Sequence, residues 1–204
     1  MDELIGVLSD SGGNDLYVQQ KKEFLDNRII VFNQEIDDNA VEDLCLHILK
    51  WNMEDIDIPI EKRKKIKIYL SSVGGDTFVT RNVVDVIMTS KTPVMGVGLS
   101  LVASGAYHIY LACSERISWP GSCYLQHDGN ISVSNSSKKA ADTFNFLNAL
   151  DENAKEFILS RTNMTSEFYD KIYETEYWMT AQRAKELGVV QKIIGEDCDI
   201  DYIF

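Results

Sequence analysis

The stretch IKIYLSSVGGDTFV, residues 66–79, decides the fold class. Its first five residues alternate in the manner of a β-strand, and Asp76 or Thr77 can cap a helix that continues through Phe78 and Val79. Between them lies a short turn that ends in a glycine pair, Gly74-Gly75. A strand, a tight turn and a helix in this order predict one unit of a parallel α/β sheet.

The same alternation extends outward in both directions from this unit. Further strands are predicted at residues 28–32, 94–99, 116–119, 123–126 and 189–194, with helices from residue 39, from residue 102, over 136–161, over 166–175 and from residue 180. The chain is therefore predicted to be an α/β protein with mostly parallel strands. No linker divides residues 28–204, which we expect to form a single domain, and residues 1–27 are polar enough to suggest a flexible or partner-dependent arm.

The long helix predicted over 136–161 carries apolar residues on more than one side. One stripe contains Phe144, Leu147 and Leu150, while Phe146 and Phe157 lie off that stripe. A helix of this kind must bury more than one face. Burial in the chain's own core and burial against a partner subunit both remain open.

Composition narrows the class of protein. The chain has 204 residues, with 20 Lys and Arg against 32 Asp and Glu, so its formal net charge is −12. A surface this acidic repels nucleic-acid phosphates and anionic membranes. No apolar run reaches the roughly 20 residues that span a bilayer, and the N-terminus lacks a basic region typical of a secretion signal. We expect a cytoplasmic protein.

The sequence gives no indication of a metal or cofactor. It has four cysteines but no C-x-x-C pair, and its three histidines have no partner at the spacing of a zinc site. It also lacks the G-x-G-x-x-G and G-K-[ST] patterns of nucleotide loops. We therefore predict that the protein uses no cofactor.

Ser104 and two glycines are the first candidates for chemistry. A serine beside alanine and glycine is most often a packing residue, but Ser104 lies where a predicted strand gives way to a helix. The Gly105 N–H would then lie at a helix N-terminus, which favours an anion. Because glycine has no Cβ, a substrate can also approach the Gly75 N–H closely. The two N–H groups could together form an oxyanion hole.

His127 is the candidate base. It follows the predicted strand 123–126 and precedes a turn, so it can reach a cleft at the end of that strand. The other histidines, His47 and His108, are given no role. The carboxylate that would orient His127 cannot be selected from 32 acids by composition.

Five segments resemble the ClpP family, the proteolytic subunits of ATP-dependent Clp proteases, within the wider ClpP/crotonase-like fold. They are RIIVFNQEIDD (28–38), IKIYLSSVGGD (66–76), GLSLVASGAY (98–107), WPGSCYLQHDG (119–129) and YWMTAQRAKELGVVQKI (177–193). Each is weak alone, but their order and spacing together are specific.

The resemblance implies roles for individual residues. Ser104 would be the nucleophile, His127 the general base, and Gly75 and Gly105 the oxyanion donors. The family's aspartate position falls on Glu176, whose side chain is one methylene longer, and Asp170 is a weaker stand-in.

The resemblance also implies an architecture and partners. The fold would be a spiral of βαβ-type units with a long protruding handle helix. Copies of the chain would stack as two rings, usually of seven subunits, around a chamber that degrades peptides and unfolded proteins. An AAA+ ATPase partner would supply unfolded substrates, since this chain has no P-loop.

Three alternatives stay open. A catalytically inactive ClpP-like subunit of a mixed ring would be consistent with the change to Glu176. A peptidase similar to SppA, the signal peptide peptidase, would pair Ser104 with a lysine such as Lys138 or Lys139. A crotonase-type enzyme would bind an acyl-CoA and use the glycine N–H groups on a thioester enolate.

Overall fold

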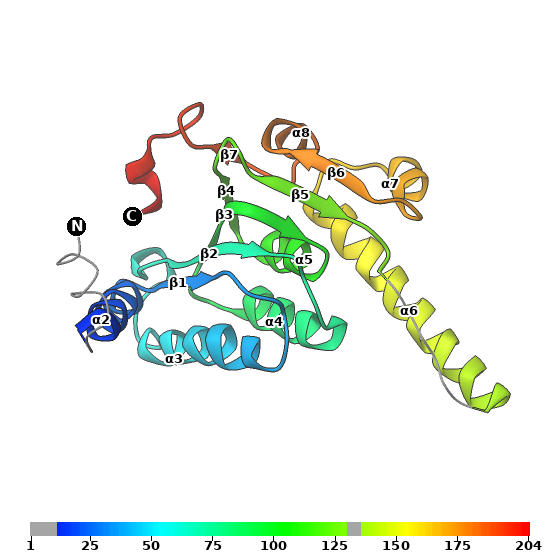
Figure 1. Cartoon of the computed structure of the whole chain (residues 1–204), viewed down its shortest axis with the longest axis horizontal. Helices are drawn as coiled ribbons and strands as arrows, with labels where there is room; N and C mark the ends of the chain where they lie inside the picture. Colours follow the sequence, from blue (N-terminus) through cyan, green and yellow to red (C-terminus); the bar gives the residue numbers. More distant parts are fainter. Residues whose placement is uncertain (1–11, 130–135) are drawn as a thin grey trace, which may run out of the picture.

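A single twisted sheet organises the chain (Figure 1). The computed structural model describes residues 12–129 and 136–204. The strands are β1 (Ile29–Phe32), β2 (Ile66–Ser72), β3 (Val94–Ala103), β4 (Glu115–Ser118), β5 (Cys123–Gln126), β6 (Tyr177–Thr180) and β7 (Lys192–Ile193). The helices are α2 (Gly12–Asp26), η1 (Val41–Leu46), α3 (His47–Glu54), η2 (Ile60–Lys62), α4 (Thr77–Thr89), α5 (Gly105–Ala112), α6 (Ser137–Arg161), α7 (Ser166–Ile172), α8 (Ala181–Glu186) and η3 (Ile200–Ile203).

The sheet is parallel along its main path, in the order β1-β2-β3-β4-β7. The long strand β3 has two partners on one side: its first half pairs with β4 and its last residues pair with β5, with Ala103 opposite Leu125. β6 then runs antiparallel to β5. The predicted α/β class with mostly parallel strands is confirmed, and the antiparallel strand β6 is an addition to the predicted elements.

The central strand β2 is buried because both faces of the sheet are covered. Its residues 66–70 are all buried, as expected for a central parallel strand. On one face α4 contributes Val83 and Ile87, and the Asp76 carboxylate caps this helix by accepting a hydrogen bond from the Val79 N–H at 2.9 Å. The other face carries a second apolar cluster that includes Tyr69, and the C-terminal segment covers it.

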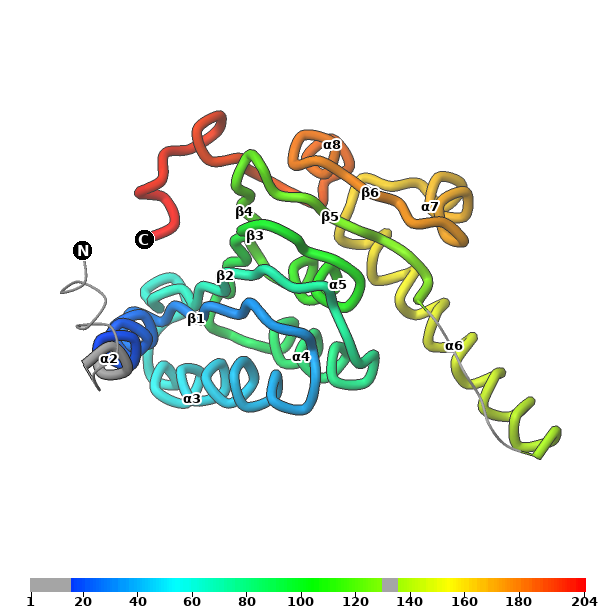
Figure 2. The backbone as a smooth tube through the Cα atoms, in the orientation of Figure 1, coloured from blue at the N-terminus to red at the C-terminus, as the bar shows by residue number. Residues whose placement is uncertain are grey.

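The described part of the predicted N-terminal arm is helical. Residues 12–26 form α2, which packs beside β1 (Figures 1 and 2). Leu25 contacts the main core, and the Phe24 ring meets the Tyr69 ring edge-on with centroids 6.3 Å apart. The sequence predicts no helix here, so α2 is an addition to the predicted elements, with Phe24 and Leu25 packed against the body of the molecule; the flexible or partner-dependent arm over residues 1–27 stays a prediction.

Helix α6 projects from the body of the molecule (Figure 2). Ile158, near its C-terminal end, is its only buried residue, while Phe144 and Phe146 are 53% and 55% exposed. The core of the chain therefore does not cover Phe144 and Phe146, in the first half of this helix. No helix in the described residues is both long and apolar enough to cross a bilayer.

Candidate active site

Ser104 occupies a strained turn between β3 and α5. Its backbone has φ 54° and ψ −124°, and the only other described non-glycine residue with positive φ is Arg28. Such conformations cost about 1–3 kcal/mol and persist only where the surrounding structure enforces them. Here the Ser104 N–H donates to the Leu125 carbonyl at 3.0 Å, and the Ser104 carbonyl accepts from the Tyr107 N–H at 3.0 Å. The turn places the serine at the carboxyl end of a parallel strand, where α/β proteins bind their ligands.

Three glycines allow backbone segments to close around Ser104. A Cβ on Gly74, whose φ is 97°, would lie 2.7 Å from the Ser104 Cβ. A Cβ on Gly75 would overlap the Ile36 carbonyl, and one on Gly105 would overlap the Thr80 hydroxyl. These positions require glycine because the chain passes too closely for any side chain.

The Gly75 and Gly105 N–H groups have no hydrogen-bond acceptor among the described residues. Ile36 pairs with the chain on both sides of Gly75: its N–H donates to the Gly74 carbonyl, and its carbonyl accepts from the Asp76 N–H, both at 2.8 Å. The Gly75 N–H lies between these two hydrogen bonds and takes part in neither. Gly105 begins α5, whose first N–H groups have no intrahelical acceptor. Two free donors therefore flank the serine turn, as an oxyanion hole requires.

His127 shares a cavity with Ser104. The cavity has a volume of about 440 Å³, and Gly75 and Gly105 also line it. Pairing of β5 with the end of β3 brings His127 there, since it follows β5 directly. The His127 Nε2 atom is buried and has no hydrogen-bond partner among the described residues.

Glu176 lies beside His127 but is not bound to it. In the antiparallel ladder, Gln126 faces Tyr177, so His127 and Glu176 are the next pair beyond its end. The Glu176 side chain is exposed, and its carboxylate accepts a hydrogen bond from the Trp178 indole N–H at 3.3 Å. No hydrogen bond joins His127 to Glu176 in the described structure. The residues at 104 and 127 are thus brought into one cavity, whereas the carboxylate lies outside it.

The other proposed partners of Ser104 lie elsewhere. Asp170 pairs with Lys155 at 2.5 Å on a cavity that contains neither Ser104 nor His127. Lys138 and Lys139 are exposed in the first turn of α6, and neither lines the serine cavity. Nothing in this arrangement favours a serine–lysine pair.

Sequence reasoning missed His108 as a residue of this site. It lies on α5 one turn after Ser104 and lines the same cavity, with its Nε2 atom buried and unpartnered among the described residues. Burial, with smaller contributions from Arg81 and His127, lowers the pKa of His108 to about 4. The sequence did contain one indication of this placement: His108 follows Ser104 by four residues, and positions i and i+4 lie on the same face of a helix.

The cavity wall also carries acidic residues. Asp128 follows His127, and Asp151 comes from α6. Burial raises the pKa of Asp151, as do Asp128 and Glu152, while a hydrogen bond from the Tyr173 hydroxyl at 3.2 Å opposes the shift. Negative charge therefore gathers where α6 passes the cavity.

Comparison with known proteins agrees with this geometry. Residues 12–197 match the model of the Clp protease family. Curated relatives include ATP-dependent Clp protease proteolytic subunit 2 of Corynebacterium diphtheriae, 24% identical over 95% of this chain and 96% of that protein. The corresponding subunit of Treponema denticola is 28% identical over 88% of each chain.

A solved structure confirms the fold. A mutant of ClpP1 from Listeria monocytogenes matches with a TM-score of 0.73 and 24% identity, covering 91% of this chain and 99% of that chain. The predicted ClpP-like α/β fold is therefore confirmed. The sequence match over almost the whole chain leads to one conclusion: this chain belongs to the Clp protease family, whose members are peptidase subunits.

Proposed function

We propose that this protein is a serine endopeptidase that hydrolyses peptide bonds through an acyl-enzyme, with Ser104 as its nucleophile. One observation carries the proposal: a strained serine turn lies between two N–H groups without acceptors and shares its cavity with His127. Packing alone gives no reason to keep a serine in this conformation.

The reaction follows from the positions of these groups. The His127 imidazole accepts the Ser104 hydroxyl proton as the oxygen attacks the carbonyl carbon of the substrate. The Gly75 and Gly105 N–H groups donate to the oxyanion of the tetrahedral intermediate. When the C–N bond breaks, His127 returns the proton to the leaving amine. Water then attacks the acyl-enzyme by the same route and releases Ser104.

Glu176 would orient the His127 ring and stabilise its protonated form. A rotation of the carboxylate away from Trp178 could bring it toward its ladder neighbour His127. A glutamate fills the third position in some serine hydrolases, so the longer side chain is compatible with catalysis.

Assembly into stacked heptameric rings is the second part of the proposal. The exposed Phe144 and Phe146 on the projecting helix α6 are suited to burial between two rings. Such rings would enclose the serine sites in a chamber, and an AAA+ ATPase of the cytoplasm would deliver unfolded proteins to it. The names of the relatives, which describe proteolytic subunits of an ATP-dependent protease, support both points.

A second function is favoured by one specific observation. The Glu176 side chain is exposed and its carboxylate accepts a hydrogen bond from Trp178, while the His127 side chain has no hydrogen-bond partner among the described residues. A catalytically inactive subunit of a mixed ring would show this arrangement permanently.

Active-site labelling with a fluorophosphonate separates the two functions. We expect a single adduct, located by mass spectrometry on Ser104, together with hydrolysis of short fluorogenic peptides. Ser104→Ala should remove both signals, whereas Ser100→Ala, at an exposed serine on the same strand, should keep them. Gel filtration of each variant reports assembly. An assembled wild-type protein without adduct or turnover would establish the inactive subunit, and an adduct at another residue would overturn the assignment of Ser104.

A further inference from the structure

A second cavity adjoins the Ser104 cavity, between α4 and α6. It has a volume of about 200 Å³, and its far wall includes Val84 and Phe157. Four residues line both cavities and are called the boundary residues below: Thr80, Arg81, His108 and Ala154.

A substrate bound at Ser104 can reach this boundary with a long side chain. His108 follows Ser104 by four residues on α5, which corresponds to about 6 Å of helix rise. Ala154 contributes only a methyl group from α6, so the boundary is not filled from that side. A side chain as long as that of glutamine or methionine therefore ends among the boundary residues.

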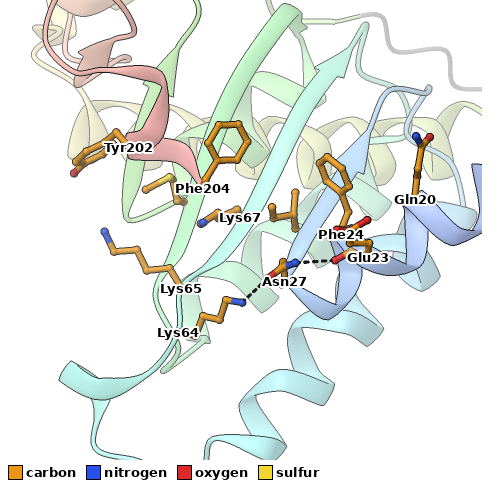
Figure 3. A pocket seen from close by; sticks show the side chains of 11 residues that line it. Gln20, Glu23, Phe24, Asn27, Lys64, Lys65, Lys67, Tyr202 and Phe204 are labelled. Atoms are coloured by element: carbon orange, nitrogen blue, oxygen red, sulfur yellow. Dashed lines mark hydrogen bonds between the residues drawn. The ribbon is translucent and has the colours of Figure 1, made fainter.

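Arg81 brings a cation without a counter-ion to the boundary. The residue is half-buried on α4, and no carboxylate among the described residues lies within 4 Å of its guanidinium. Two lysines on the wall of another cavity, drawn in Figure 3, show the more usual arrangement. Lys65 pairs with Glu115 at 2.6 Å. Lys64 donates to the Asn27 side chain at 3.0 Å. Arg81, in contrast, has N–H groups to offer to an acceptor on a substrate.

His108 adds an uncharged hydrogen-bonding group. Its Nε2 atom is buried and has no hydrogen-bond partner among the described residues. Burial, with smaller contributions from Arg81 and His127, lowers the pKa of this imidazole to about 4, so the ring is neutral at pH 7. A nitrogen of a neutral imidazole donates or accepts a hydrogen bond, depending on the tautomer. Leaving such a buried atom without a partner costs free energy, which a suitable substrate group would recover.

The charges around the Ser104 cavity disfavour a charged substrate group. Three carboxylates line it, those of Asp76, Asp128 and Asp151, and Arg81 is the only lysine or arginine among the described residues that does. A negative group on the substrate would be repelled by the carboxylates, and a positive group would meet Arg81 at the boundary. The site therefore favours a group that is polar but uncharged.

We propose that the boundary residues form a specificity pocket that selects glutamine at the residue whose carbonyl Ser104 attacks. This inference rests on the proposed peptidase function. The side-chain carbonyl of glutamine accepts a hydrogen bond from Arg81, and its amide group can pair with His108 Nε2 in either tautomer. Methionine has the same length but neither group, glutamate adds a negative charge, and lysine places a second cation beside Arg81.

Four fluorogenic peptides that differ in one residue test this proposal. They are acetyl-Ala-Ala-X-aminomethylcoumarin with X as glutamine, methionine, glutamate or lysine, each cleaved after X. We expect kcat/KM for the glutamine peptide to exceed that of each other peptide by at least about 10-fold, because a site that hydrogen-bonds a substrate group rejects analogues that lack it. A glutamine peptide cleaved no faster than one of the other three would overturn the inference.

Two variants assign the contacts. Arg81→Met should lower the ratio of kcat/KM between the glutamine and methionine peptides about 10-fold, and His108→Phe should lower the same ratio if Arg81→Met does not fold. Lys91→Met is the matched control, since Lys91 is an exposed cation that lines neither cavity, and its ratio should equal that of the wild type. A glutamine preference that survives in both folded variants would overturn the assignment.

This inference and the proposed function fail in different ways. Fluorophosphonate labelling of Ser104 together with similar rates for all four peptides would overturn the glutamine pocket and leave the peptidase standing. An assembled protein with neither adduct nor turnover would overturn the proposed function and the pocket with it.

Discussion

The Ser104 turn and the His127–Glu176 ladder end face one another across the candidate site, but they are held in very different ways. Around Ser104, segments from β3, α4 and the Gly74-Gly75 turn meet so closely that a single added methyl group would collide with backbone or side-chain atoms. At the other half, β5 has just ended and β6 has not yet begun, Glu176 is exposed, and the His127 side chain has no hydrogen-bond partner among the described residues.

This difference shows which half of the site the single chain builds by itself. The nucleophile and its N–H donors are fixed by the same contacts that fix the core, so their geometry is coupled to folding. The base and the acid are placed by the end of a short ladder, and no hydrogen bond among the described residues joins their side chains. We expect changes in the first half to affect stability and activity together, and changes in the second half to affect activity alone.

Replacement of His127 should give the largest effect. His127→Ala removes the base, and we expect peptide hydrolysis to fall about 10,000-fold or more, as with the histidine of other serine hydrolases. Because His127 makes no hydrogen bond that the core needs, the free energy of unfolding should change by less than about 1 kcal/mol. Turnover of a fluorogenic peptide and urea denaturation measure the two quantities. A large loss of stability would show that the second half is as tightly coupled to the fold as the first.

Gly74→Ala tests the first half. The new Cβ would meet Ser104 Cβ at 2.7 Å in a backbone of positive φ, so we expect a loss of about 3 kcal/mol in the free energy of unfolding together with loss of activity. Gly121→Ala is the matched control, since an added Cβ there meets nothing within 4 Å. Its stability should stay within about 0.5 kcal/mol of the wild type. Similar stabilities for the two variants would contradict the tight packing of the serine turn.

The same contrast explains how much of the site the sequence predicted. Ser104, Gly75 and Gly105 belong to short strand–turn–helix patterns, whose local chemistry is visible in the residues themselves. The predicted junction at Ser104 and the helix cap at Asp76 are confirmed by the structure. What the residues could not show is the positive φ at Ser104, because it results from contacts with β5 and with the glycine turn.

Long-range pairing limits what the sequence predicts elsewhere. The segment YWMT, residues 177–180, has no clear alternation and is not predicted as a strand, yet as β6 it pairs with β5 and brings Glu176 beside His127. Glu176 is selected only through a family resemblance, since 32 acids offer no local criterion. The helix α2 is missed for a similar reason, because its order depends on the docking of Phe24 and Leu25.

Glu176→Gln should have a smaller effect than His127→Ala. Loss of the carboxylate removes the charge that supports protonated His127, and we expect kcat/KM to fall about 100-fold with stability unchanged. Glu174→Gln, at an exposed acid two residues earlier, is the control and should retain full activity. If Glu176→Gln is as active as the wild type, another acid or none supports His127, and the second half of the site is built from different residues.

The smallest effect concerns His108, which lines the cavity shared by both halves. Its pKa is about 4 in the folded protein, because of burial first and of Arg81 and His127 second, against about 6.5 when unfolded. Between these values the unfolded state binds a proton that the folded state does not, so the free energy of unfolding falls as the pH drops from 6.5 to 4. His108→Phe removes this group and therefore this loss. As the pH drops from 6.5 to 4, the free energy of unfolding of the variant should rise relative to that of the wild type by an amount on the order of 2 kcal/mol. Urea denaturation at several pH values measures the difference, and parallel curves would mean that His108 is protonated equally in both states and that the cavity between the two halves is open to water.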